Sequence, residues 1–321
     1  MSTPSVHVII LNWNGLPDTL ECLAALRRQD YPALKVWVVD NGSAEVEAET
    51  VRREYPEVEV LPQGANLGFC GGNNVGIRSA LDAGADYVLV LNNDTVSPPN
   101  FVSDLIAQSA RLERVGAVSP LILRHPEEDL IWYAGAAWEP ETAGFRHLLE
   151  DQPRTELRAR EPYPTTYACG CCLLVPATVL RRVGLMDERY FAYYDEADWC
   201  ARMKNAGFEC YVVPTVSISH KVSRSTPGLI SAYLMARNRL LWMRENLPRR
   251  ERWRSARYLV KEFVWNALNA AGLPPGGRHI SSLHSRVMLL AWRDFLLRRF
   301  GGFPDSVARL ANPTAKAART E

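Results

Sequence analysis

Short apolar runs alternate with amphipathic or polar segments through the first 120 residues of the chain. The apolar runs have the length of strands, and they cover residues 6–11, 34–39, 58–61, 88–91 and 115–119. The segments with a helical pattern cover residues 16–28, 45–54, 73–83 and 100–113. Uninterrupted apolar runs indicate strands that are covered on both faces. The alternation therefore predicts β-α-β units and an α/β fold with a mostly parallel central sheet flanked by helices.

The pattern changes after residue 120. Residues 131–161 are irregular, with several Trp, Pro and Gly residues. The regular elements expected beyond them are a strand over 167–175, helices over 176–183 and 196–205, and strand-like stretches over 211–213 and 216–219. Residues 227–300 have a helical pattern in which Trp, Leu and Arg are interleaved.

These changes of pattern suggest how the chain is organised. We expect a domain over residues 1–226, made of a ligand-binding half (1–120) and a second half (121–226). A basic helical region over 227–305 and a disordered tail over 306–321 follow it. No apolar run approaches the ~18 residues of a membrane span. The apolar run that begins at Val6 has only six residues, so it is expected to be a first strand and not a signal peptide.

Charge is distributed unevenly in this chain of 321 residues. The net charge is +1, but residues 231–300 hold fourteen Lys or Arg and four Asp or Glu, so this segment carries +10 and the remainder about −9. A basic segment favours an anionic partner. The seven cysteines are odd in number, which favours buried, reduced thiols in a cytosolic protein.

Polar side chains follow three of the predicted strands. The three groups are Asn12-Trp13-Asn14, Asp40-Asn41 and Asn92-Asn93-Asp94. A single group of this kind would indicate a turn, because Asn and Asp favour turns. Three groups at the carboxyl ends of neighbouring parallel strands indicate a ligand site instead. Asp94 is the candidate ligand for a hard divalent cation that is shared with a phosphate group.

A second acidic group lies at the start of the helix predicted over 196–205. Asp195, Glu196 and Asp198 occur there among aromatic residues, which are Tyr190, Phe191, Tyr193, Tyr194 and Trp199. Acidic residues also occur at ordinary helix starts because of the helix dipole, but the dipole does not account for the aromatic residues. A partly desolvated carboxylate can act as a general base, and the aromatic faces could stack on a sugar ring.

Two further features have both structural and functional interpretations. His220 ends a predicted strand and is either a structural histidine or a metal ligand. The segment GANLGFCGGNNVG, residues 64–76, is glycine-rich but contains neither the dinucleotide fingerprint nor a P-loop. We expect a loop over 64–72 that approaches a ligand closely, with Asn66 and Asn73 as its polar contacts.

Taken together, these motifs resemble family 2 glycosyltransferases, and in particular their rhamnosyltransferase-like subgroup. The segments that carry the resemblance are VIILNWNG, VVDNGS, NLGFCGGNNVGI, LVLNNDT and GCCLLVPATVLRRVGLMDERYFAYYDEADWCAR, with His220 downstream. The similarity covers roughly residues 5–300. It implies a GT-A fold with a Rossmann-like nucleotide-binding half and an acceptor half. It also implies sugar transfer from a nucleotide sugar with inversion.

The resemblance also implies roles for individual residues. Asp94 and His220 correspond to metal ligands, for Mg²⁺ or Mn²⁺. Glu196 corresponds to the catalytic base, with Asp195 as its competitor. The nucleotide-sugar site would comprise Leu11, Asn12, Trp13, Asn14, Asp40, Asn66, Gly68, Asn73, Asn92 and Asn93. The acceptor site would comprise Cys169, Gly170, Tyr194, Asp198 and Trp199. One departure is Asn92, an amide where the family's DxD motif has its first acid.

The implied donor is dTDP-rhamnose or a UDP-sugar, and the implied acceptor is a glycan or a lipid-linked sugar of a bacterial cell-surface polysaccharide. For the basic helical segment, one interpretation is that its Arg and Trp stems cover the domain. The other is that Trp242, Trp253, Trp265 and Trp292 form a peripheral contact with an anionic membrane. We expect a cytoplasmic location, either free or at the inner face of the cell membrane. We expect no nucleic-acid partner, and a homodimer is one expected oligomeric state. The alternative functions are a nucleotidyltransferase and a non-catalytic nucleotide-sugar-binding protein.

Overall fold

The computed structural model describes residues 3–43, 45–222, 228–273 and 281–312. The chain forms two compact units, each assembled from separate stretches of the sequence. The sheet unit comprises residues 1–137, 146–187 and 195–223, and the helical unit comprises residues 138–145, 188–194 and 224–321. The expected boundary at residues 226 and 227 lies outside the described residues. The expected division also did not anticipate that two early segments belong with the C-terminal helices.

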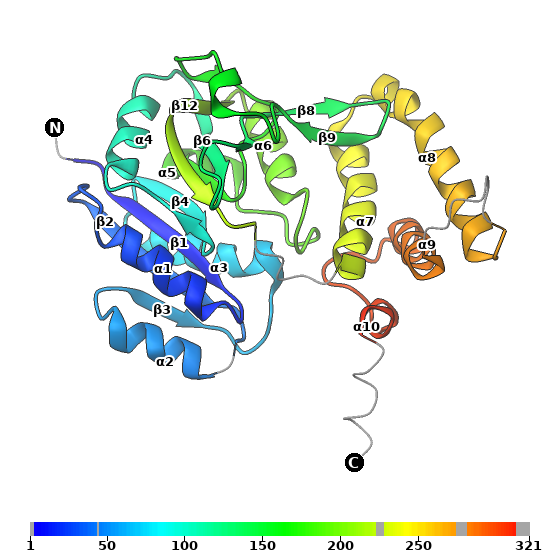
Figure 1. Ribbon diagram of the computed structural model, residues 1–321, viewed down its shortest axis with the longest axis horizontal. Coiled ribbons are helices and arrows are strands. Elements are labelled where there is room, and N and C mark those ends of the chain that lie inside the picture. Colours follow the sequence, from blue (N-terminus) through cyan, green and yellow to red (C-terminus); the bar gives the residue numbers. More distant parts are fainter. Residues whose placement is uncertain (1–2, 44, 223–227, 274–280, 313–321) are drawn as a thin grey trace. The chain divides into compact units, whose positions relative to one another are not determined.

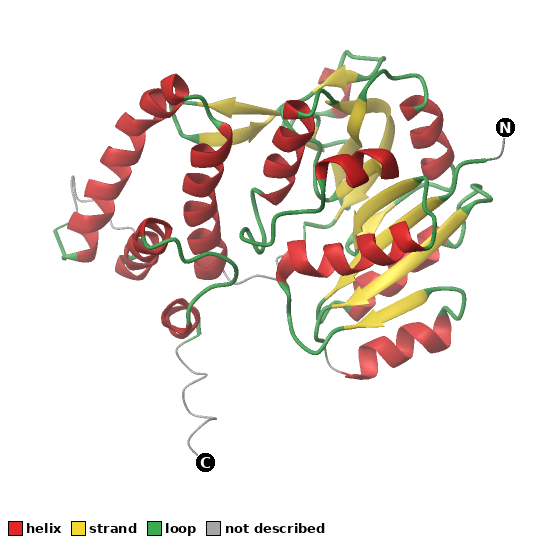
Figure 2. Ribbon diagram, turned by 180° about the vertical axis from the view of Figure 1, so that it is seen from behind, coloured by secondary structure: helices red, strands yellow, loops and turns green. Residues whose placement is uncertain are grey.

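The sheet unit is built around one large mixed sheet (Figures 1 and 2). Its strands are β1 (Val6–Asn12), β2 (Leu34–Asp40), β3 (Glu59–Pro62), β4 (Tyr87–Asn92), β5 (Thr95–Val96), β6 (Val115–Arg124), β7 (Ile131–Tyr133), β10 (Tyr163–Pro164), β11 (Cys172–Pro176) and β12 (Glu209–His220). The order is β10-β12-β6-β11-β4-β1-β2-β3, with β5 paired to β12 and β7 paired to β6. Its helices are α1 (Leu16–Leu26), α2 (Glu45–Glu54), α3 (Gly68–Asp82), α4 (Phe101–Ser109), α5 (Ala177–Val183) and α6 (Asp195–Asn205), with a short 3₁₀ turn, η1 (Arg154–Glu156).

Strand β1 lies between β2 and β4 and is parallel to both. The chain runs outward from β1 through β2 to β3 and then returns to the other side of β1 as β4. Helices α1 and α3 accordingly cover opposite faces of the sheet (Figures 1 and 2). The carboxyl ends of β1 and β4 therefore form a topological switch point, the position where open α/β sheets bind ligands. The predicted α/β fold with a mostly parallel central sheet flanked by helices is confirmed. Strand β11 is the antiparallel strand between β4 and β6.

The glycine-rich segment differs from its expected form. A loop was expected over residues 64–72, but α3 begins at Gly68, four residues after the start of that loop. A Cβ atom on Gly72 would lie 2.3 Å from Cδ1 of Leu11, and one on Gly76 would lie 2.4 Å from Cγ2 of Ile9. Both distances are shorter than any ordinary contact. These two glycines therefore allow α3 to pack closely against β1, and ligand approach is not needed to explain them.

Two strands of the second half also differ from expectation. The strand expected over 167–175 is only β11, because regular pairing begins at Cys172. The two stretches expected at 211–213 and 216–219 are one strand, β12, which continues through an irregularity between Val213 and Ser217. This continuity carries β12 along β6 as far as His220.

The helical unit contains α7 (Gly228–Asn246), α8 (Arg249–Ala270), α9 (Ser282–Leu296) and α10 (Asp305–Ala311). It also includes residues 138–145, which lie in the hairpin of β8 (Ala136–Glu139) and β9 (Gly144–His147). Ile230, Tyr233, Val287, Ala291 and Val307 form part of its apolar core. Residues 306–311 of the expected disordered tail form part of α10, with Val307 fully buried, whereas residues 313–321 of that tail lie outside the described residues. Among the described residues, no helix has the length and apolar character that a bilayer-spanning segment needs.

Helix α7 holds the segment of residues 188–194 through a buried amide. Asn238 is fully buried, and its Nδ2 donates to three nearby carbonyl oxygens, those of Tyr190 (2.7 Å), Ala192 (2.8 Å) and Tyr193 (2.9 Å). The neighbouring Arg237 is also buried and donates to the carbonyl of Gly302 (2.7 Å) and to Oδ1 of Asn238. Left-handed backbone, which is unfavourable for aromatic residues, occurs in this segment at Phe191, Tyr193 and Tyr194. The clamp formed by Arg237 and Asn238 keeps the segment in this conformation.

Candidate active site

The three polar strand ends lie side by side at one edge of the sheet. In the β1–β2 pair Asn12 lies opposite Asp40, and in the β1–β4 pair Leu11 lies opposite Asn92. The prediction that these ends belong to neighbouring parallel strands is therefore confirmed.

The side chain of Asn12 forms its hydrogen bonds with other residues of the protein. It is buried, and its Nδ2 donates to Oδ1 of Asp40 (3.1 Å), Oγ of Ser43 (3.3 Å) and Oε2 of Glu47 (2.8 Å). These contacts make Asn12 a residue that positions Asp40. They do not support the expectation that its side chain touches the nucleotide. Of its neighbours in the expected site, Leu11 and Trp13 are partly buried and Asn14 is exposed.

Asn41, which belongs to the second polar strand end but was given no role of its own, connects the end of β2 to the start of α3. Its Nδ2 donates to Oδ1 of Asn66 (3.1 Å), and its Oδ1 accepts the backbone N–H of Leu67 (2.9 Å). Oδ1 of Asn66 also accepts the N–H of Gly68 (2.7 Å), whose φ of +75° suits glycine. Asn41 could have been found from its position directly after Asp40 at a strand end.

Asn73 lies within α3, and its expected place in the nucleotide-sugar site stays a prediction. Its side chain is fully buried within α3, and its Nδ2 donates to the carbonyl of Phe69 (2.9 Å) one turn earlier. A side chain in this position has no surface to offer a ligand. The expectation placed Asn73 in a loop, whereas the helix already includes it.

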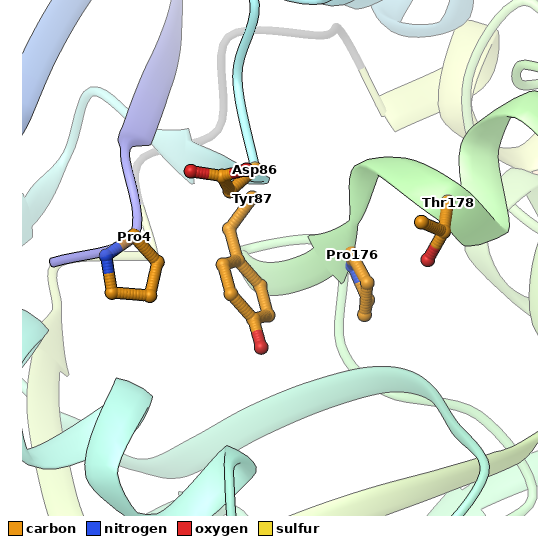
Figure 3. Close-up of a pocket in the computed structure, with 5 residues that line it drawn as sticks. All are labelled: Pro4, Asp86, Tyr87, Pro176 and Thr178. Atoms are coloured by element: carbon orange, nitrogen blue, oxygen red, sulfur yellow. The ribbon is translucent and has the colours of Figure 1, made fainter. Parts of the chain in front are cut away.

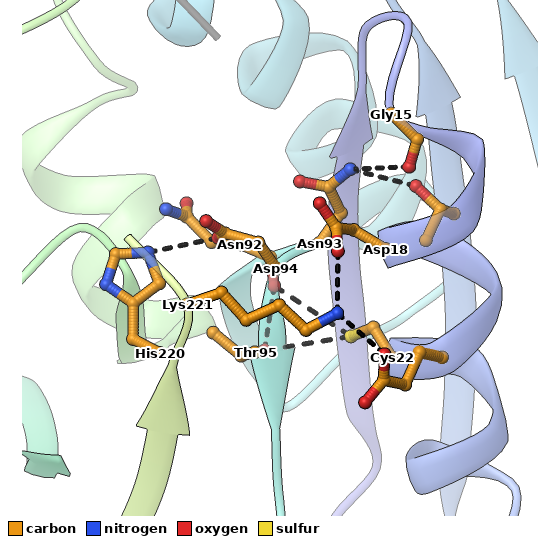
Figure 4. Close-up of polar contacts among 11 residues, drawn as sticks. Gly15, Asp18, Cys22, Asn92, Asn93, Asp94, Thr95, His220 and Lys221 are labelled. Carbon is orange, nitrogen blue, oxygen red and sulfur yellow. Dashed lines mark hydrogen bonds and ion pairs between the residues drawn. The ribbon is translucent and has the colours of Figure 1, made fainter. Parts of the chain in front are cut away.

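Asp94 and His220 meet although 126 positions separate them in the chain. Oδ1 of Asp94 and Nε2 of His220 are 3.0 Å apart, and both side chains are buried (Figure 4). Antiparallel pairing of β5 with β12 places His220 opposite Thr95, which explains the contact. The Trp132 ring lies edge-on to the His220 ring at 4.6 Å between centroids. The two predicted metal ligands therefore lie within reach of a single cation.

A lysine next to this pair fixes the strand end from the other side. The backbone N–H of Lys221 donates to the carbonyl of Asp94 (3.0 Å). Its Nζ lies 2.6 Å from Oδ1 of Asp18 and 2.6 Å from Oε2 of Glu21, both on α1 (Figure 4). Lys221 thus ties the end of β12 to α1. No local sequence signal distinguishes it from an ordinary surface lysine.

The donor set at this corner is one carboxylate and one imidazole. Within the described ranges, no group of three or more His, Cys, Asp or Glu side chains could hold a metal ion. Divalent cations such as Mg²⁺ bind through one or two carboxylates plus substrate phosphates, and they do not need a full protein cage. The residues present therefore fit a cation that a diphosphate ligand also coordinates.

The first turn of α6 carries Asp195 and Glu196. Asp195 is buried and Glu196 partly buried, and the side chain of Glu196 lies against the backbone of Gly170, where a Cβ atom would be 3.7 Å from its Oε1. Burial raises the pKa of Glu196, although hydrogen bonds from the backbone of Glu196, Ala197 and Gly170 partly offset the effect. A carboxylate with a raised pKa is a stronger proton acceptor, as a general base requires.

Two residues expected in the acceptor site are part of the protein interior. Asp198 is buried, and its Oδ2 pairs with Nε of Arg202 at 2.8 Å, one helical turn away. Trp199 has no exposed surface, and its indole N–H donates to the carbonyl of Gly184 (2.9 Å). The Asp198–Arg202 pair lies within α6, and Trp199 ties α6 to Gly184, so the contacts described for both side chains are inside the protein. The acceptor role expected for them stays a prediction. Cys169 is buried as well, while Gly170 borders Glu196.

Tyr194, the remaining residue of the expected acceptor set, belongs to the helical unit, where its ring lies 5.7 Å from that of Phe145.

A pocket of ≈ 320 Å³ lies elsewhere on the sheet unit, and its lining residues are Pro4, Asp86, Tyr87, Pro176 and Thr178 (Figure 3). Tyr87 begins β4 and Pro176 ends the antiparallel β11 beside it. The pocket is thus at the amino ends of the parallel strands, at the edge opposite Asp94. It contains none of the predicted site residues.

The raised pKa of Glu196 gives a prediction for stability. A carboxylate whose pKa is above the ordinary value of 4.5 in the folded state destabilises the fold when it is charged. This cost is absent below about pH 4.5 and is complete once the pH exceeds the folded-state pKa. We expect Glu196→Gln to melt a few degrees higher than the wild type at pH 8, with the difference shrinking toward pH 5. Thermal unfolding across this range checks it, with the exposed Glu113→Gln as control. If Glu196→Gln melted at a lower temperature than the wild type at pH 8, a raised pKa for Glu196 in the folded state would be contradicted.

Comparison with known proteins shows which family this chain belongs to. The family model described as "Glycosyl transferase family 2" matches residues 7–184. The N-acetylglucosaminyl-diphospho-decaprenol L-rhamnosyltransferase of Mycobacterium tuberculosis is 30% identical over 262 residues, which cover 74% of this chain and 82% of the relative. The dTDP-rhamnosyl transferase RfbF of Shigella flexneri is 22% identical over 256 residues, 75% of this chain and 81% of that protein.

Solved structures show the same fold at lower identity. GalNAc-T7, solved with UDP, GalNAc and Mn²⁺, has a TM-score of 0.59 and 16% identity, and the match covers 92% of this chain but only 56% of that one. TarS of S. aureus, residues 1–349, has a TM-score of 0.56 and 14% identity, with 96% and 83% covered. The strand ends, the Asp94–His220 pair and the acidic start of α6 therefore lie in a GT-A fold. The chain belongs to glycosyltransferase family 2, is rhamnosyltransferase-like, and is a glycosyltransferase.

Proposed function

We propose that this protein transfers a sugar, with inversion, from a nucleotide sugar to a hydroxyl group of a glycan or lipid-linked acceptor in cell-surface polysaccharide synthesis. The observation that carries the proposal is the Asp94–His220 contact at the same sheet edge as Asp40. dTDP-rhamnose is the favoured donor, because two relatives are named as rhamnosyltransferases and one of them as a dTDP-rhamnosyl transferase. UDP-sugars are the alternative.

The row of strand ends suits a nucleoside diphosphate. Asp40 is held by Asn12 at the end of β2, where it can accept hydrogen bonds from a base. Asp94 and His220 lie two strands away, past β1 and on the β4 side. A ligand spanning the carboxyl ends of β2, β1 and β4 would place its base at Asp40 and its diphosphate at Asp94.

Asp94 and His220 would hold a Mg²⁺ or Mn²⁺ ion together with the diphosphate oxygens. Such an ion, when bound, neutralises the charge that develops on the departing nucleoside diphosphate. GalNAc-T7 and a mannosyltransferase of Pyrobaculum calidifontis were both solved with Mn²⁺, which supports this assignment by analogy. Asn92 adds an amide and no negative charge, so the protein itself contributes a single carboxylate here.

Glu196 is the proposed base. It would remove the proton from the acceptor hydroxyl as that oxygen attacks the anomeric carbon from the face opposite the leaving group. A single displacement requires one base and no enzyme nucleophile, which fits one carboxylate with a raised pKa. Asp195 is the competing assignment, because it occupies the same helical turn.

The donor class can be tested by ligand-induced stabilisation. A ligand that binds only the folded state raises the melting temperature by mass action. We expect dTDP-rhamnose to give the largest rise in a panel of dTDP, UDP, GDP and CDP sugars, with a further rise when Mn²⁺ is added. The Mn²⁺ effect should disappear in Asp94→Asn. A metal-independent rise, or none with any nucleotide, would oppose the proposed donor site.

The base can be tested by two matched substitutions. Glu196→Gln removes the proton acceptor while keeping the shape of the side chain, so we expect transfer to fall by about 100-fold or more. Donor affinity, measured by calorimetry, should remain within about twofold of the wild type because only the acceptor step is affected. Asp195→Asn should retain most activity. If Asp195→Asn abolishes transfer and Glu196→Gln does not, the two roles are exchanged.

The surface of α8 supports a second proposal, a peripheral contact with an anionic membrane. Trp253, Val260, Val264 and Leu268 recur at helical spacing and are 78%, 61%, 49% and 39% exposed. Exposed basic residues accompany them at Arg250, Arg254, Arg257 and Lys261. Exposed apolar and basic residues on one helix are typical of interfacial helices. By contrast, Trp242 is buried within the helical unit, where it packs against Trp138 and Phe145, so it is not part of this surface.

Vesicle binding tests this surface. The protein should cosediment with vesicles of phosphatidylglycerol and phosphatidylcholine more than with phosphatidylcholine alone, and less at high salt. Trp253→Ala should reduce binding roughly threefold or more. Val46→Ala, which removes a 65% exposed side chain from α2, is the control and should bind normally. Equal binding of the two variants would oppose a contact through α8.

A further inference from the structure

A buried threonine joins the two ends of the proposed donor site. Thr19 lies in α1 and has no exposed surface. Its hydroxyl donates to Oδ1 of Asn12 (2.8 Å) and accepts from Nδ2 of Asn93 (2.9 Å). Asn12 in turn donates to Asp40 (3.1 Å). A continuous chain of hydrogen bonds therefore runs from Asn93 after β4, through α1 and β1, to Asp40 at the end of β2.

The direction of this chain is set where Asn12 meets two carboxylates, those of Asp40 (3.1 Å) and Glu47 (2.8 Å). A carboxylate can only accept hydrogen bonds, so Asn12 must turn its Nδ2 toward Asp40 and its Oδ1 toward Thr19. The threonine hydroxyl must then donate to Asn12, which leaves its lone pairs for Nδ2 of Asn93. Hydrogen bonds aligned in one direction polarise and strengthen one another. Asp40 and Glu47 thereby fix the orientation of the Asn12 amide, and through Thr19 that of the Asn93 amide.

The same chain holds the corner that carries Asp94. Nδ2 of Asn93 also donates to the carbonyl of Gly15 (3.3 Å; Figure 4). A Cβ atom on Gly15 would lie only 2.7 Å from this nitrogen, so the amide fills the space beside the glycine. Asn93 precedes Asp94 directly, and its side chain is anchored to α1. The position of Asp94 therefore depends on the contact that Thr19 provides.

We propose that Thr19 is a positioning residue that couples the nucleoside end of the donor site, at Asp40, to the diphosphate end, at Asp94. This inference rests on the proposed function for the meaning of the two ends. Binding at one end that orders the chain favours binding at the other, and the coupling is reciprocal. Thr19 itself touches neither the ligand nor a cation.

The quantity to measure is the metal enhancement, the ratio of dTDP dissociation constants without and with Mn²⁺, obtained by calorimetry. Thr19→Val keeps the shape but removes both hydrogen bonds, so we expect the enhancement to fall by about tenfold. Thr19→Ser retains the hydroxyl and should restore it. Thr50→Val is the matched control, because Thr50 is also buried but donates only to the carbonyl of Val46 in its own helix (2.7 Å).

A purely local role for Thr19 predicts a different result. If the chain transmits coupling, Asp40→Ala should also lower the metal enhancement, and it should lower it no further in the Thr19→Val background. Independent effects that add would overturn the proposal. It would also be overturned if Thr19→Val kept the wild-type enhancement, or if Thr19→Ser lost as much as Thr19→Val.

A readout without ligand separates this inference from the proposed function. The side-chain amide protons of Asn12 and Asn93 should exchange slowly with solvent in NMR spectra of the wild type and Thr19→Ser, and faster in Thr19→Val. If the wild type binds no nucleotide but shows this protection pattern, the proposed function fails and the hydrogen-bond chain stands. Equal exchange in all three proteins would overturn the chain itself.

Discussion

The position of β1 between two parallel neighbours sets the geometry of the candidate site. Its register places Asn12 opposite Asp40 on one side and Leu11 opposite Asn92 on the other. Parallel strands end at the same edge of a sheet, so strand pairing alone brings the three polar strand ends together there. The second half of the sheet depends on the same row, because β11 pairs with β4 and β12 brings His220 to the residue that follows Asp94.

The polar groups at this edge are buried, and their hydrogen bonds explain how the fold tolerates them. A buried polar group without a partner costs about 1–3 kcal/mol. Asn12 and Thr19 avoid this cost because they form a hydrogen bond with each other. Asn12 also bonds to Asp40, and Thr19 to Asn93. Glu196 is the opposite case, since burial raises its pKa and backbone hydrogen bonds offset this only in part. The side chains of Asn12, Thr19 and Asn93 are therefore paired within the protein, while the raised pKa of the proposed base favours its accepting a proton.

The residues that could be found from sequence were those whose neighbours in the chain reveal their position. Asp40 and Asp94 follow uninterrupted apolar runs, which placed them at strand ends and predicted their common edge. Thr19 had no such signal, because a threonine in a helix looks the same whether it faces solvent or two asparagines. Asp198 and Trp199 lie on the buried face of α6, and the acids near the start of this helix do not show from sequence which face that is. The i,i+4 spacing of Asp198 and Arg202 was the available clue.

The clamp on residues 188–194 has a consequence for how this chain can be divided. Asn238 supplies the amide that three backbone carbonyls of an earlier segment share, and that segment leads directly into α6. Deleting the C-terminal helices would therefore remove the hydrogen bonds that hold residues 188–194, the segment directly before α6. Grafting those helices onto another sheet would bring a donor without its acceptors. Because each unit is assembled from separate stretches of the chain, neither unit can be cut out as one continuous segment.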